Sequence, residues 1–137
     1  MTTTPFSIRR GDIYYIDFGA LPGSSQHGIR PGLIIQNNTG NRHAPTVIVA
    51  AITSSVKKLN QPTHVFIDSQ FGLERPSMLM AEQLFTVDKS SLLRYIGTVD
   101  SAFLQEANRA LNRSIGLCPE YPGTDHGTNR FRYGGIS

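Results

Sequence analysis

The sequence predicts a mainly β fold with helices, in which a small, strongly curved antiparallel sheet or barrel is closed by a C-terminal helix. Short β-branched and aromatic segments recur, with turn signals roughly every eight to twelve residues. Thirteen glycines and eight prolines favour turns over long helices, and the one long amphipathic segment comes after the strands. A chain of 137 residues is long enough to form one hydrophobic core.

The expected strands differ in how deeply they should be buried. Residues 10–18 alternate between two faces, as a half-buried strand does. Residues 45–53 are almost wholly apolar and β-branched, which is typical of a strand buried on both faces. The remaining strands are expected at residues 31–37, 63–67, 77–83 with a continuation over 84–87, and 95–99.

The connections carry turn and helix signals. A polar, glycine-rich loop is expected at residues 19–30, a turn at 38–41 and one helical turn at 88–93. One long helix is expected over residues 101–115, with Asp100 as its N-cap and Gly116 as its end. The residues expected on its apolar face are Phe103, Leu104, Ala107, Leu111 and Ile115.

Composition limits the function classes. A net charge of +3 and a pI near 9.3 permit a polyanionic partner without requiring one. The single cysteine, Cys118, excludes an intrachain disulfide and a cysteine-rich zinc site, and the four histidines show no metal-binding spacing. No apolar run approaches the ~20 residues that span a bilayer, and no signal peptide is evident, so a cytoplasmic protein is expected.

Two polar residues occupy positions where a β-rich fold can build a site. Arg30 lies between the glycine-rich loop and the next strand, where a guanidinium can hold a phosphate with two donors. Thr53 ends the buried strand, and its hydroxyl can both donate to and accept from a phosphate oxygen. Plain structural interpretations stay open: Arg30 as a surface residue that pairs with a carboxylate, and Thr53 as a residue that ends a strand.

Glu82 and Gln83 form a third candidate. Neighbouring residues of a strand face opposite sides, so one of the two is expected to face inward or into a groove. There it would contribute to base recognition or support Arg30. An ordinary surface pair is the alternative.

Several segments occur together in one order and spacing. They are Arg10-Gly11-Asp12-Ile13-Tyr14, Gly28-Ile29-Arg30-Pro31-Gly32-Leu33-Ile34-Ile35-Gln36-Asn37, Gly40-Asn41-Arg42, Pro45-Thr46-Val47-Ile48-Val49-Ala50-Ala51-Ile52-Thr53, Pro62-Thr63-His64-Val65, Met80-Ala81-Glu82-Gln83 and the span 86–89. In this arrangement residues 9–117 resemble the MazF/PemK family of toxin endoribonucleases, and they look closest to its Gram-positive-type members. The resemblance divides the chain into a flexible leader (1–8), a toxin domain (9–117) and a flexible tail (118–137).

The resemblance implies a fold and an activity. The fold is the small SH3-like barrel with a C-terminal helix that CcdB-, Kid- and MazF-like toxins share. The active unit is a homodimer that cleaves single-stranded RNA at a short sequence, with no metal or cofactor, and leaves 2′,3′-cyclic phosphate and 5′-hydroxyl ends. A cognate MazE-like antitoxin segment blocks the same groove.

The resemblance also assigns roles to residues. The catalytic pair falls on Arg30 and Thr53. The expected RNA-contacting residues are Ser24, Ser25, Gln26, His27, Ser77, Glu82 and Gln83.

The chain departs from the family pattern at two of these positions. Ser25 stands where the family often has Glu, and His27 stands where it has Gly, so base recognition is expected to differ. His27 is either a participant in proton transfer or a surface histidine. Two other functions remain open, a gyrase poison that cuts no RNA and an inactive RNA-binding member of the family.

Overall fold

The computed structural model describes residues 7–19 and 27–117. Most of the expected leader (1–8) and the whole expected tail (118–137) lie outside these ranges. Along the chain the elements are β1 (Asp12–Asp17), β2 (Ile29–Ile34), α1 (Asn38–His43), β3 (Thr46–Thr53), β4 (His64–Ile67), β5 (Ser77–Asp88), η1 (Lys89–Ser91), β6 (Leu92–Thr98) and α2 (Ser101–Ile115).

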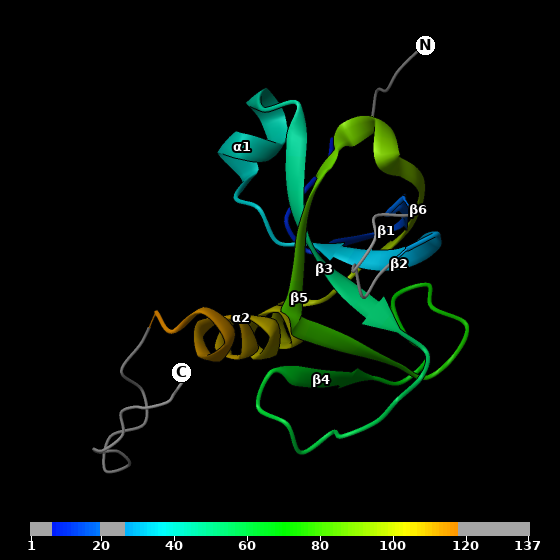
Figure 1. The fold of residues 1–137 in the computed structure, drawn as a ribbon, viewed down its shortest axis with the longest axis vertical. Coiled ribbons are helices and arrows are strands. Elements are labelled where there is room, and N and C mark those ends of the chain that lie inside the picture. The colour runs from blue at the N-terminus through cyan, green and yellow to red at the C-terminus, as the bar shows by residue number, and fades with distance from the viewer. Residues whose placement is uncertain (1–6, 20–26, 118–137) are drawn as a thin grey trace.

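The six strands form one antiparallel sheet in the order β4-β5-β3-β2-β1-β6 (Figure 1). The predicted class, a curved antiparallel sheet with a C-terminal helix, is confirmed. The expected closure into a barrel is not: in the described part of the chain β4 and β6 remain the two edges of an open hydrogen-bonded sheet.

The turn between β4 and β5 lies directly on β6. A Cβ atom on Gly72 would lie 2.2 Å from the carbonyl oxygen of Ile96, and one on Gly97 would lie 2.0 Å from that of Phe71. Such distances exclude a side chain at either position, so glycine is needed where the two backbones meet. This close contact, rather than a ladder of hydrogen bonds, brings the β4–β5 turn and the β6 edge together.

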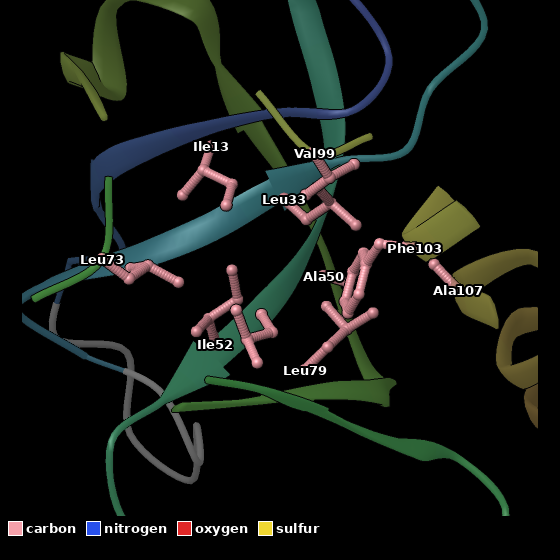
Figure 2. Packing of buried hydrophobic residues seen from close by; sticks show 10 residues of the cluster. Ile13, Leu33, Ala50, Ile52, Leu73, Leu79, Val99, Phe103 and Ala107 are labelled. Atoms are coloured by element: carbon pink, nitrogen blue, oxygen red, sulfur yellow. The ribbon is translucent and has the colours of Figure 1, made fainter. Parts of the chain in front are cut away.

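β3 lies inside the sheet and is buried on both faces, as its composition predicted. Ala50 and Ile52 face the main core, which Figure 2 shows between the sheet and the start of α2. Val47 and Val49 face a second cluster on the other side. Because β3 pairs with β2 and with β5, it joins strands that lie far apart in the sequence.

α2 matches its sequence signals closely. The carboxylate of Asp100 accepts a hydrogen bond from the backbone N–H of Phe103 at 2.8 Å, and Gly116 ends the helix in the left-handed conformation. Phe103, Ala107 and Leu111 are buried as expected. Ile115 is instead exposed, because it lines an open apolar groove at the end of the helix.

Two local predictions are wrong. Residues 38–41 form the start of α1 rather than a turn, because the side chain of Asn37 accepts a hydrogen bond from the N–H of Gly40 and caps a short helix. β2 begins at Ile29, inside the expected loop, and ends at Ile34. It begins early because the β1–β2 hairpin continues to Gly19 and Gly28, where the N–H of Gly28 donates to the carbonyl of Gly19 at 2.8 Å.

Candidate active site at the ends of β2 and β3

Arg30 is the second residue of β2 and therefore lies in the sheet, not at a loop junction. It pairs with Ile16 of β1, and this pairing fixes its backbone. Its side chain is exposed, and its Nε donates a long hydrogen bond of 3.3 Å to the carbonyl of His27. Among residues 7–19 and 27–117, this weak contact is the one hydrogen bond of the guanidinium, which has further donors for an anionic ligand.

The registers of β2 and β3 place Arg30 and Thr53 on one face of the sheet. The two antiparallel strands pair as far as Gly32 and Ala51. Arg30 lies two residues from Gly32 and Thr53 lies two residues from Ala51, and residues two apart in a strand project to the same face.

Thr53 is the last residue of β3 and is half-buried. Its hydroxyl oxygen accepts a hydrogen bond from the backbone N–H of Ser55 at 3.0 Å. This contact fixes the oxygen, and the hydroxyl proton can still be donated to a ligand. A guanidinium and an oriented hydroxyl on one face form an arrangement that can bind a phosphate from two sides.

Glu82 lies where β5 bends. β5 pairs with β3 through Ala51–Met80 on one side of an irregularity and through Ala50–Leu84 on the other, so three residues of β5 are unpaired with β3. In this bend Glu82 accepts hydrogen bonds from the Thr63 hydroxyl at 2.8 Å and from Nε2 of His64 at 2.9 Å. Partial burial acts to raise the pKa of Glu82, but these hydrogen bonds outweigh it and hold the pKa below its ordinary value.

His64 links Glu82 to the loop that follows Thr53. Its Nδ1 lies 3.0 Å from the carbonyl oxygen of Lys58, and its Nε2 faces the Glu82 carboxylate. Both partners are hydrogen-bond acceptors, and the ring bridges the Lys58 carbonyl and the Glu82 carboxylate. Lys58 has a positive φ of 54°, a conformation that a non-glycine residue adopts only when its surroundings hold it.

The other expected RNA-contacting residues are placed less uniformly. His27 is exposed and adjoins Arg30 through its carbonyl. Ser77 is buried, and its hydroxyl donates to the carbonyl of Arg75, so its side chain is not offered to a ligand. Gln83 neighbours Glu82 in the bend of β5 and is half-buried. Three further candidates lie outside the described residues: Ser24, Ser25 and Gln26.

Reasoning from the sequence missed Thr63 and His64 as the partners of Glu82. Thr63 directly precedes β4 and His64 begins it, and their contacts with Glu82 span nineteen and eighteen residues along the chain. The signal was present in the Pro62-Thr63-His64-Val65 segment, but only the pairing of β4 with β5 shows what it contacts. The expected support of Arg30 by Glu82 is replaced in the structure by these contacts.

Among residues 7–19 and 27–117 there is no cluster of three or more histidine, cysteine, aspartate or glutamate side chains that could hold a metal ion. Neither helix in these ranges is long and apolar enough to cross a membrane.

Comparison with known proteins shows the family of this chain. The family described as PemK-like, MazF-like toxin of type II toxin–antitoxin systems matches residues 9–115. The chain belongs to this family. MazF-like relatives include endoribonuclease EndoA of Bacillus subtilis, 44% identical over 80% of this chain and 96% of its own length. Endoribonuclease MazF of Staphylococcus saprophyticus is 45% identical over 80% of this chain and 92% of its own length.

Among solved structures, a mycobacterial endoribonuclease in complex with its cognate antitoxin has a TM-score of 0.70. It is 29% identical and covers 82% of this chain and 98% of its own. A MazF structure from Deinococcus radiodurans, with a TM-score of 0.70 at 20% identity, shares the fold.

Proposed function

We propose that Arg30 and Thr53 form the centre at which this chain, a MazF-like endoribonuclease toxin, cleaves single-stranded RNA. The observation that carries the proposal is the β2–β3 register, which brings an exposed guanidinium and an oriented hydroxyl to one face. The endoribonuclease relatives, 44–45% identical over most of the chain, support the reaction class. Both residues come from rigid strands, which favours a fixed geometry at the scissile phosphate.

The proposed reaction is an internal transesterification. The 2′-hydroxyl of the substrate gives up its proton to solvent water as its oxygen attacks the adjacent phosphorus. The bond from phosphorus to the 5′-oxygen breaks, and the 5′-oxygen takes a proton from solvent, so the products carry a 2′,3′-cyclic phosphate and a 5′-hydroxyl. Arg30 stabilises the negative charge that builds on the phosphate oxygens. Thr53 donates its hydroxyl proton to one of these oxygens and orients the phosphate. Arginine is a poor base at its usual pKa, so the proposal gives Arg30 no role in removing the 2′ proton.

The RNA on either side of the phosphate is proposed to contact His27, Glu82 and Gln83. His27 adjoins Arg30, and its ring can bind a base or take part in proton transfer. Glu82 presents a carboxylate with a lowered pKa, and a carboxylate accepts hydrogen bonds from base amino groups. The loop residues Ser24, Ser25 and Gln26 belong to the same proposal.

Cleavage of a long single-stranded RNA in EDTA tests the reaction, and primer extension maps the cut positions and end chemistry. We expect Arg30→Ala to lower kcat by at least about 100-fold, as removal of a charge-stabilising group does. Its fold should be retained, because the side chain is exposed and its hydrogen bond to His27 is long. Thr53→Ser is the matched control for Thr53→Val, because it keeps the hydroxyl.

A requirement for Mg²⁺, or full activity in Arg30→Ala, would contradict the proposed centre. Tight RNA binding without product would instead indicate an inactive RNA-binding protein. Growth arrest with intact RNA and trapped DNA breaks would indicate a gyrase poison.

We further propose that the active unit is a homodimer that works in the cytoplasm and is blocked by an antitoxin segment. A groove of about 550 Å³ at the end of α2 supports an apolar partner surface. Ile48, Ile115 and Leu117 line it with partly exposed apolar side chains. The mycobacterial relative, solved with its cognate antitoxin, supports an antitoxin partner. Light scattering of the purified chain tests the dimer, and a monomer at micromolar concentration would contradict it.

A further inference from the structure

Phe66 is an exposed aromatic side chain on β4, which is an edge strand. It pairs with Met78 of β5, and Met78 pairs with Thr53 of β3. Three neighbouring strands therefore contribute one residue each to a single row that ends at Thr53, and Arg30 lies on the same face of the next strand, β2.

Burial confirms which face the row occupies. Val65 and Ile67, the neighbours of Phe66 in β4, pack into the main core, and Ile67 is fully buried. Phe66 must then project to the opposite face, because neighbouring residues of a strand alternate. It shares this face with Thr53, since directly paired antiparallel residues project to the same side.

The row also sets a distance. Neighbouring strands lie about 4.8 Å apart, so the backbone of Phe66 lies about 10 Å from that of Thr53, two strands away. The side chain of Met78 is 2% exposed and forms a buried apolar floor between them. Phe66 itself is 43% exposed and can present a ring to a ligand that lies along the row.

We propose that Phe66 is a stacking platform for an unpaired RNA base close to the scissile phosphate, and so contributes to substrate selection. This inference rests on the proposed function. When Arg30 and Thr53 hold the scissile phosphate, the nucleotides on either side of it lie along this face of the sheet. Unpaired bases stack on aromatic rings without a partner strand. Loss of such a platform typically weakens binding by about 5- to 100-fold.

Fluorescence offers a direct test, because the chain contains no tryptophan. Phe66→Trp therefore adds a single tryptophan in the proposed platform. The probe is an RNA oligonucleotide that spans a mapped cleavage site and carries one 2′-deoxy nucleotide there, so that it binds without being cut. Stacking predicts quenching that saturates with RNA binding.

Tyr95→Trp is the matched control, since Tyr95 is a 51% exposed aromatic on β6, at the other edge of the sheet. We expect no comparable quenching there. Equal quenching in both variants, or none in Phe66→Trp, would overturn the inference.

Kinetics provide a second arm. Phe66→Leu keeps an apolar side chain of similar size but removes the ring, and we expect KM to rise about 5- to 100-fold with kcat little changed. Phe66→Tyr should restore the wild-type KM. An unchanged KM in Phe66→Leu would refute the stacking platform. A shift of this variant from dimer to monomer would also refute it, because Phe66 would then belong to a self-association surface. Failure of the wild-type chain to cleave RNA would refute the proposed function itself.

Discussion

The contact between the β4–β5 turn and β6 gives a sharp stability prediction. A Cβ atom on Gly97 would lie 2.0 Å from the carbonyl oxygen of Phe71, whereas carbon and oxygen normally approach to about 3.3 Å. Gly97→Ala therefore has to separate two backbone segments by about 1.3 Å, and a backbone cannot rotate away as a side chain can. Overpacking of this kind costs typically 1–3 kcal/mol and sometimes more, and we expect about 3 kcal/mol.

A loss of that size should lower Tm by roughly 12 °C in a folded domain of this size. The assay is urea unfolding followed by circular dichroism, at one fixed protein concentration because dimerisation also affects the midpoint. Gly116→Ala is the control. Its φ is +70° and no atom lies within 4 Å of the added Cβ, so it reports the conformational cost alone, about 1–2 kcal/mol. A Gly97→Ala loss no greater than that of Gly116→Ala would refute the proposed steric contact.

Three further predictions concern stability. Asp100→Ala should cost about 1 kcal/mol in urea unfolding, because it removes the 2.8 Å cap of α2, and Asp100→Asn should restore most of it. Leu79→Ala should cost about 3 kcal/mol, since Leu79 is fully buried in the main core, and a loss below 1 kcal/mol would contradict that packing. Because folding lowers the pKa of Glu82, its ionised carboxylate stabilises the fold at pH values above the ordinary carboxyl pKa. This stabilisation is lost as the pH falls through the lowered pKa of the folded state. Thermal melts of wild type and Glu82→Gln should therefore converge at acid pH, and a constant difference would argue against the His64 contact.

The sequence alone determined the elements whose signals are local. Asp100 caps the start of α2 and Gly116 ends it, as the sequence predicted, because capping depends on residues within one turn. The β-branched composition of β3 predicted its burial on both faces. The matching family segments also named Arg30 and Thr53, although the residues by themselves left a plain surface interpretation open.

The tertiary structure decided everything that depends on which strands are neighbours. In the strand order of the sheet, β4 and β6 are edge strands that do not pair with each other. The irregularity in the pairing of β5 is where Glu82 contacts Thr63 and His64. The register between β2 and β3 placed Arg30 and Thr53 on one face, and the registers of β5 with β3 and β4 placed Phe66 in a row with Thr53. Register could not be predicted from local sequence because the side-chain period of a strand is two, so a shift by one residue would send each side chain to the opposite face. Only the packing of both faces of the sheet selects one alignment.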